Sequence, residues 1–377
     1  MRASFLLLIS LFALQLSAVK PSGKIIVEWV TSLKKEQSFD VHREYAGAIV
    51  RGDDIVVALR SGEIVILDKS GKVRLRRQYE GSHTTKPLLD TSDDTLYVST
   101  GLALRALDSY YDEKWYISFR APIATRPLID GDTVYVATLD NSVYAIDRKR
   151  GVILGSYTSY DPVPLTYIHL ADPIKIDDKI VFGFANGNIV FFMIQKDGPD
   201  AVNIIPYFRF RTKKSTVTTG HRFYDLFSLQ GDIDNLLFSN GELGGKVISG
   251  KTVPVTHMEN IILTKSNDST SYIGYGQNGI YQFSQTGDFE RHLFQTQNFV
   301  SGLLSGKEGV IVTTEGEPTF LARREGAVYF INSNYSKLYD TLMVPGGISS
   351  QPVQCEDGIL VLTNTGALTK IILKENR

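Results

Sequence analysis

The chain repeats one pattern of four short strands about every forty residues, and this repeat limits its possible folds more than any other feature. The copy at Thr125–Tyr157 reads TRPLIDGDTVYVATLDNSVYAIDRKRGVILGSY. Runs of about six β-branched and aromatic residues alternate with turns rich in Gly, Asp and Asn, which is typical of antiparallel hairpins. Four such strands cannot bury both of their faces alone. The sequence therefore predicts that successive copies stack against one another.

Eight copies can be recognised along the chain. They are Ala46–Tyr79, Thr85–Phe119, Thr125–Tyr157, Ala171–Phe210, Tyr224–Val255, Ile261–Phe294, Val300–Met343 and Gln351–Leu373. The last copy supplies only three strands, and an isolated strand predicted at Lys24–Leu33 can provide the missing outer one. The sequence thus predicts an all-β fold, an eight-bladed β-propeller of four-stranded antiparallel blades, with the N-terminal strand closing the last blade. Because the fifth copy is weak, seven blades are the alternative.

The composition agrees with this fold. The chain is 43% hydrophobic and contains 19 Tyr, 19 Phe and 32 Gly, which suits strands and turns better than helices. A net charge of −1 gives no global field that would favour nucleic acid. The single cysteine, Cys355, excludes an internal disulfide and a cysteine-based metal site. Its place in a predicted strand indicates a buried, unreactive thiol.

The first eighteen residues differ from the rest and read as a secretory signal. Arg2 precedes an apolar run, Phe5–Leu14, that is too short to span a bilayer. Residues 16–18 resemble the start of a bacterial lipobox, but Val19 stands where the lipidated cysteine would be. We therefore expect a signal peptide at 1–18 and a single propeller domain at 19–377.

Recurring aspartates have a structural interpretation. Asp68, Asp108 and Asp147 follow the third strand of successive copies, where a carboxylate can accept hydrogen bonds from nearby backbone amides. The tripeptide Arg51-Gly52-Asp53 resembles an adhesion motif, but it occupies a turn that recurs as Gly131-Asp132 without the arginine. We interpret these residues as turn formers. The six histidines show no ligand spacing: His42, His83, His169, His221, His257 and His292.

The sequence LIDGDTVYVATLDNSVYAIDRKRGVIL resembles the PQQ-type propeller repeat. The shared features are a hydrophobic strand, Gly-Asp, a Val-Tyr-Val strand, a turn, Tyr-Ala-Ile-Asp and a glycine before the outer strand. The first three copies match best, and the resemblance extends over essentially everything after the signal. It implies the propeller fold but leaves several functional classes open, because function resides in sites added to a fold.

Two branches of this family compete. The quinoprotein dehydrogenases hold PQQ and calcium on the propeller axis and typically use a vicinal cysteine pair. A single cysteine and only two tryptophans, Trp29 and Trp115, disfavour that branch. We therefore expect no enzyme, no cofactor and no metal site. The other branch is the BamB-like subunit of the outer-membrane β-barrel assembly machinery, which the chain resembles in size, in its single ring and in lacking a cofactor.

The BamB-like resemblance implies a scaffold that binds protein partners. It would be exported to the periplasm or the periplasmic face of the outer membrane, as a monomer within a complex, with peripheral membrane association at most. The implied partner is a barrel-assembly subunit or a nascent outer-membrane protein, and no nucleic acid is expected. Family members are normally lipoproteins, and Val19 departs from that pattern. A stand-alone exported propeller that binds a ligand, a glycan or a surface partner is the alternative.

Two connections exceed the two to six residues that are usual between strands of a compact domain. Thr158–Ala171 is apolar and carries two prolines, and Arg209–Arg222 carries a cationic run. An apolar loop beside a basic one suits docking on an acidic protein surface, although tolerated insertions are the simpler alternative. The partner-binding residues predicted from them are Tyr160, Leu165, Tyr167, Arg209, Arg211, Lys213 and Lys214.

Overall fold

The computed structural model describes the chain from residue 23 to residue 375 with internal gaps. The described ranges are 23–34, 43–159, 172–184, 188–211, 228–231, 236–239, 243–248, 251–256, 260–266, 269–276, 279–284, 289–296, 298–306, 309–316 and 325–375. Between residues 210 and 272 only the backbone is described. Within these ranges every regular element is a β-strand, and no helix there is long and apolar enough to cross a bilayer.

The described strands pair into eight four-stranded antiparallel sheets, which we number in chain order. Sheet 1 contains β2 (Ala48–Arg51), β3 (Asp54–Ala58), β4 (Glu63–Leu67) and β5 (Val73–Gln78). Sheet 2 contains β6 (Leu88–Asp90), β7 (Thr95–Thr100), β8 (Ala103–Leu107) and β9 (Glu113–Ser118). Sheet 3 contains β10 (Leu128–Asp130), β11 (Thr133–Ala137), β12 (Ser142–Asp147) and β13 (Ile153–Thr158). Sheet 4 contains β14 (Ile174–Ile176), β15 (Lys179–Gly183), β16 (Asn188–Lys196) and β17 (Val202–Arg211).

The second half of the chain continues the same order. Sheet 5 contains β18 (Ser228–Gly231), β19 (Leu236–Ser239), β20 (Leu243–Ile248) and β21 (Lys251–Thr256). Sheet 6 contains β22 (Asn260–Ser266), β23 (Ser269–Gly276), β24 (Gly279–Phe283) and β25 (Phe289–Gln295). Sheet 7 contains β26 (Phe299–Gly306), β27 (Gly309–Glu315), β28 (Glu325–Ile331) and β29 (Leu338–Pro345). Sheet 8 contains β30 (Val353–Cys355), β31 (Gly358–Leu362), β32 (Ala367–Glu375) and β1 (Gly23–Ser32).

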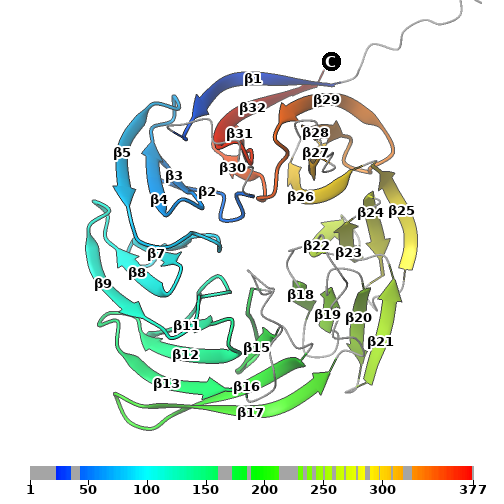
Figure 1. Cartoon of the computed structure of the whole chain (residues 1–377). Helices are drawn as coiled ribbons and strands as arrows, with labels where there is room; N and C mark the ends of the chain where they lie inside the picture. Colours follow the sequence, from blue (N-terminus) through cyan, green and yellow to red (C-terminus); the bar gives the residue numbers. More distant parts are fainter. Residues whose placement is uncertain are drawn as a thin grey trace, which may run out of the picture.

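The sheets surround a common centre, as in a β-propeller (Figure 1). The first strand of each sheet lies nearest the centre, and the outer ring is formed by β5, β9, β13, β17, β21, β25, β29 and β1. The core consists of apolar layers between neighbouring sheets. Ile64 and Ile66 of sheet 1, for example, pack with Leu96 and Val98 of sheet 2. Successive side chains of a strand point to opposite faces of its sheet. Because apolar residues occupy both faces, each sheet packs against a neighbour on both sides.

The N-terminal strand completes the last sheet, as the sequence predicts. β1 pairs antiparallel with β32 from Gly23 opposite Glu375 to Ser32 opposite Ala367, with a bulge between Val27 and Trp29. A further cluster joins sheet 8 to sheet 1, with Leu33, Leu360, Leu362 and Leu368 against Ile55, Val57 and Leu67. The two ends of the described chain therefore lie side by side in one sheet (Figure 1).

The turn residues act as the sequence predicts. Asp68 Oδ1 accepts hydrogen bonds from the backbone amides of Ser70 (2.9 Å) and Lys72 (3.0 Å). Asp108 and Asp147 accept equivalent backbone bonds in sheets 2 and 3. Gly131 has a φ of +59°, in the left-handed region that favours glycine. The four strands predicted for the copy at Thr125–Tyr157 all form, as β10 to β13.

Candidate functional site

Few of the residues predicted to bind a partner fall in the described part of the chain. Tyr160, Leu165, Tyr167, Lys213 and Lys214 lie outside the described residues. Arg211 is the last residue of β17, where only its backbone is described, opposite Asn188 of β16. Arg209 lies in the same strand, opposite Val190, and its side chain is exposed.

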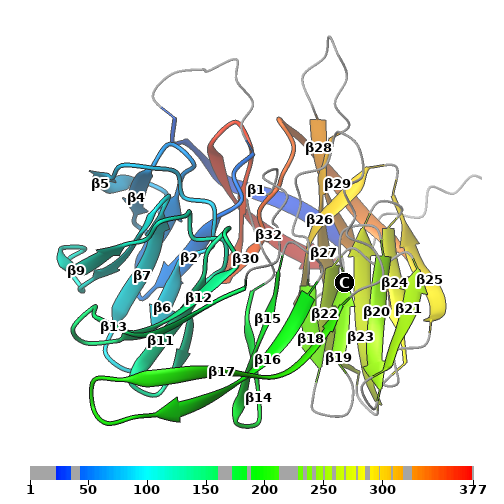
Figure 2. The same ribbon diagram turned by 60° about the horizontal axis from the view of Figure 1, so that its bottom comes forward.

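β17 is the outermost strand of sheet 4, and its two halves have different surroundings. In the first half, Val202 and Ile204 are buried against Leu154 and Tyr157 of sheet 3. The β16–β17 hairpin extends along the outside of β13 (Figures 1 and 2). At the tip of the hairpin, Asp200 forms an ion pair with Arg150 of sheet 3 at 2.6 Å. The hairpin is thereby anchored to the neighbouring sheet.

The second half of β17 presents aromatic and cationic side chains to solvent. Tyr207 is 61% exposed and Phe208 is 38% exposed. The Lys179 ammonium lies 5.1 Å from the centre of the Tyr207 ring, and the Phe191 and Phe208 rings meet edge to face at 5.9 Å. Exposed large apolar side chains next to cations are typical of surfaces that contact other proteins. We call Lys179, Tyr207, Phe208 and Arg209 the β17 surface.

Sequence reasoning identified only one member of the β17 surface, Arg209. Phe208 lies within β17 and was not among the predicted partner-binding residues. Tyr207 and Lys179 gave no separate signal, because they are distant in sequence and meet only when β15 and β17 lie in one sheet. The run PYFRFR could have indicated exposure, since an outer strand with large side chains at consecutive positions must present some of them to solvent.

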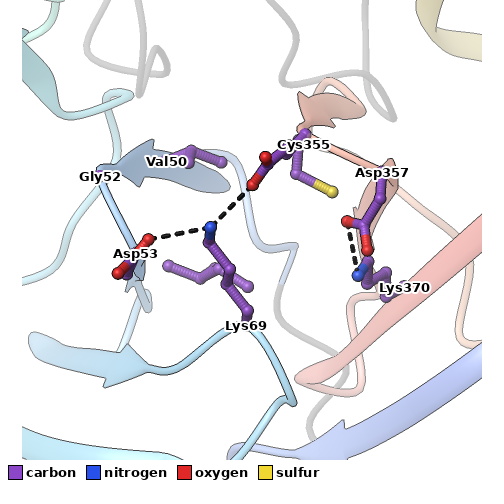
Figure 3. Close-up of a pocket in the computed structure, with 9 residues that line it drawn as sticks. Val50, Gly52, Asp53, Lys69, Cys355, Asp357 and Lys370 are labelled. Atoms are coloured by element: carbon purple, nitrogen blue, oxygen red, sulfur yellow. Dashed lines mark hydrogen bonds and ion pairs between the residues drawn. The ribbon is translucent and has the colours of Figure 1, made fainter.

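A second polar region lies where the first and last sheets meet. There, a cavity of about 30 Å³ is lined by Lys69, Cys355 and Lys370, among others. Lys69 pairs with Asp53 (2.9 Å) and Glu356 (2.7 Å) (Figure 3). Such a volume holds about one water molecule, so the cavity itself is too small for an organic ligand.

The second lysine that lines this cavity, Lys370, is also ion-paired, and the cysteine, Cys355, is not activated. The buried Lys370 ammonium pairs with Asp357 at 2.7 Å (Figure 3). It also pairs with Glu28 at 2.8 Å. Cys355 lies in β30, as expected, but it is half-buried rather than fully buried. Burial raises the pKa of its thiol, which disfavours the reactive thiolate. The geometry thus indicates a polar junction between the two sheets.

A larger open groove of about 720 Å³ lies between sheets 7 and 8 and shares Cys355, Glu356 and Asp357 with the small cavity. Ile359, Ile372 and Leu373 supply its apolar lining, and Gln354 and Glu356 supply polar groups. The Gln354 amide is held by the carbonyls of Cys355 (2.9 Å) and Gly358 (3.0 Å). Its volume is in the range of small-molecule sites. Across the described residues, no group of three or more His, Cys, Asp or Glu side chains could hold a metal ion.

Comparison with known proteins points to one family. Residues 85–198, which include sheets 2 and 3, match the family model described as outer membrane protein assembly factor BamB. No curated protein sequence matches the chain significantly.

Two solved structures have the same fold. The crystal structure of BamB from Moraxella catarrhalis has a TM-score of 0.68 and 17% sequence identity, and the match covers 93% of this chain and 100% of that one. The computationally designed Ika8 protein has a TM-score of 0.61 and 10% identity, covering 90% of this chain and 98% of that one. The resemblance predicted from the sequence is confirmed: residues 85–198 match the BamB family model, and the chain shares its propeller fold with a solved BamB.

Proposed function

We propose that this chain is a non-catalytic, exported propeller scaffold that binds protein partners during assembly of outer-membrane β-barrel proteins. The observation that carries the proposal is the match of residues 85–198 to an outer-membrane assembly factor, together with a fold likeness to BamB over 93% of the chain. The proposed location is the periplasm or the periplasmic face of the outer membrane. The partner is a barrel-assembly subunit or a nascent outer-membrane protein.

We further propose that the ring has eight blades rather than seven. Eight sheets of four strands can be followed in the described residues. The weak fifth copy supplies a complete set of paired strands, β18 to β21. The apolar contact between sheets 8 and 1 also supports closure of the ring after the eighth blade.

The partner is proposed to dock over sheet 4 and the connections that flank it. The predicted residues Tyr160, Leu165, Tyr167, Arg209, Arg211, Lys213 and Lys214 belong to this region of the chain. The β17 surface supports this placement, because it combines an exposed aromatic anchor, Tyr207, with the cations Lys179 and Arg209. Aromatic and arginine side chains are enriched among residues that dominate binding energy, and the cations favour an acidic partner surface.

A pull-down from bacterial envelope extracts tests the proposal. Bait carrying Tyr207→Ala and Arg209→Ala should capture a barrel-assembly subunit at least tenfold less than the unaltered chain, since each lost anchor costs about 1–2 kcal/mol. Tyr110→Ala is the matched control, because Tyr110 is 77% exposed in a turn of sheet 2. Leu165→Ala with Tyr167→Ala tests the flanking connection. Equal capture by every variant would place the contact elsewhere, and no assembly subunit in any eluate would contradict the function.

The groove between sheets 7 and 8 favours a second candidate, a stand-alone propeller that binds a small ligand or glycan. Its volume of about 720 Å³ and its mixed lining would accommodate one or two sugar rings. A glycan array separates the candidates. A glycan whose binding is abolished by Ile372→Lys but not by the β17 surface variants would support this alternative over the scaffold.

A further inference from the structure

One position recurs at the inner end of several sheets and differs chemically each time. It lies two residues before the innermost strand and is always followed by a proline. The residues are Lys86 in sheet 2, Arg126 in sheet 3, Asp172 in sheet 4 and Gln351 in sheet 8. Strand register confirms that they are equivalent, because Leu88, Leu128, Ile174 and Val353, each two residues later, begin the pairing with the second strand. We call these positions the inner-rim positions.

The backbone fixes each inner-rim position from both sides. The following proline locks φ and is buried, as Pro127 and Pro352 show. The preceding residue is a buried hydroxyl in sheets 2, 3 and 8, and Thr125 Oγ1 accepts a hydrogen bond from the Ala137 amide at 2.9 Å. Since the innermost strands line the centre of the ring (Figure 1), these side chains start from its inner rim.

At two inner-rim positions, the side chain forms hydrogen bonds with the backbone of the preceding sheet. Gln351 of sheet 8 donates to the carbonyl of Ser301 (3.2 Å) and accepts from the Leu303 amide (3.3 Å), both in sheet 7. Asp172 of sheet 4 accepts from the backbone amide of Arg126 in sheet 3 at 3.0 Å. The inner-rim residues of sheets 3 and 4 are therefore neighbours. The same arrangement between sheets 2 and 3 predicts that Arg126 lies next to Lys86.

The charges at this rim are not balanced. In the described part of the chain, neither the Lys86 ammonium nor the Arg126 guanidinium has an ion-pair partner, and the Asp172 carboxylate contacts the backbone of Arg126 rather than its side chain. The Arg126 Nε atom is buried and has no acceptor. Burial, followed by repulsion from Arg126, lowers the pKa of Lys86, while Asp172 raises it. A buried donor without an acceptor, next to a second cation, is the environment that an anion stabilises.

We propose that Lys86 and Arg126 form a binding site for an oxyanion, a carboxylate or phosphate group, at the inner rim between sheets 2 and 3. The guanidinium would hold two oxygens with parallel N–H donors, and the ammonium would act as a point charge beside it. Both side chains are half-buried rather than fully buried, so a small anion can reach them from solvent. The site is independent of the docking surface proposed on sheet 4.

Isothermal titration calorimetry with inorganic phosphate and with citrate, each at constant ionic strength, tests this site. The unaltered chain should show saturable binding of at least one anion. Lys86→Gln and Arg126→Gln should each weaken binding about tenfold or more, because each removes hydrogen bonds to a charged group. Lys149→Gln is the matched control, since Lys149 is an exposed turn lysine and the same net charge is lost. Preference for phosphate over citrate, or the reverse, identifies the class of ligand.

Measuring the melting temperature, Tm, of each variant separates loss of anion binding from loss of folding. Without an added anion, Lys86→Gln should leave Tm unchanged or raise it, because it relieves repulsion with Arg126. A saturating concentration of anion should raise the Tm of the unaltered chain but not that of the Lys86→Gln variant. No saturable binding by the unaltered chain overturns the proposal, as does identical affinity in Lys86→Gln and Lys149→Gln. If Arg126→Gln fails to fold, Arg126→Lys tests whether the fork geometry is required.

Discussion

The indole of Trp115 donates a hydrogen bond from Nε1 to the carbonyl oxygen of Arg148 at 3.0 Å. Trp115 lies on β9, the outer strand of sheet 2, and Arg148 lies in the turn that follows β12 of sheet 3. The ring also lies against this turn, because a Cβ built on Gly151 would come within 2.5 Å of it. The outer edge of one sheet is thereby joined to the next by a single side chain.

Trp29 makes the same contact between sheets 8 and 1. Its Nε1 donates to the carbonyl of Lys69 at 3.1 Å, and a Cβ on Gly71 would come within 2.6 Å of its ring. Trp29 and Trp115 therefore occupy equivalent outer-strand positions, and each contacts the turn of the next sheet in the same way. In both places the glycine is required by space as well as by backbone conformation.

Gly151→Ala should destabilise the protein more than Gly131→Ala. Both glycines have positive φ, +67° and +59°, so both substitutions carry a backbone cost of about 1–2 kcal/mol. Only Gly151 faces the indole, whereas nothing lies within 4 Å of a Cβ at Gly131. We expect a loss of about 3 kcal/mol or more for Gly151→Ala, measured by urea unfolding. In a Trp115→Ala background, the extra cost should disappear; persistence of the difference would show that it has another origin.

Arg51→Met should cost about 2 kcal/mol of folding stability, because it removes hydrogen bonds from a buried charged group. The Arg51 side chain is only 6% exposed and joins sheets 1 and 2 through the Asp94 carboxylate (2.9 Å) and the Asp108 carbonyl (2.8 Å). Lys69→Met is the matched control, because Lys69 also links two sheets but is 51% exposed. The ion pairs of Lys69 are screened by water and salt, so Lys69→Met should lower folding stability by less than about 1 kcal/mol. Equal losses in chemical denaturation would contradict the assigned role of burial.

Acid should destabilise the fold through His83. The imidazole is buried, with Nδ1 2.8 Å from the Ser99 carbonyl oxygen, and burial lowers its pKa to about 4. Between pH 6.5 and 4 the unfolded chain binds a proton that the folded chain does not, so stability falls as pH falls through this window. The full effect is about 3 kcal/mol and levels off below pH 4. Urea midpoints across this range should show the slope in the unaltered chain, and a His83→Gln variant with an unchanged slope would refute the assignment.

Removal of residues 1–33 should abolish cooperative folding. Without β1, the edge of β32 is unpaired, and Ile25 no longer packs with Phe330 and Ile371. An exposed hydrophobic edge is prone to aggregation. A synthetic peptide of residues 23–32 added in trans should restore a single thermal transition, whereas the same peptide with Ile25→Asp should not. A fully cooperative transition in the shortened chain alone would show that closure by β1 is dispensable.

Local patterns determined most of the fold. Alternating side chains and Gly-Asp turns were sufficient to predict the strands of sheets 1 to 4, because each hairpin is specified by residues close in sequence. The placement of the N-terminal strand followed from counting, since the last copy lacked one strand. Sheet 5, whose copy is weak in sequence, also forms four paired strands.

Contacts across sheets could not be predicted in this way. Nothing in the sequence relates Lys179 to Tyr207, or Arg51 to Asp94, because such pairs depend on register and on the angle between neighbouring sheets.

The sequence by itself therefore determined the repeating unit, its turns and the closing strand, all of which rest on short-range backbone preferences and periodic burial. Only the tertiary structure decided which side chains share the inner rim. Lys86, Arg126 and Asp172 come from three copies separated along the chain, and their juxtaposition arises because the closed ring brings the starts of successive inner strands together. The electrostatics of that rim are a property of the assembled ring, and no single copy of the repeat encodes them.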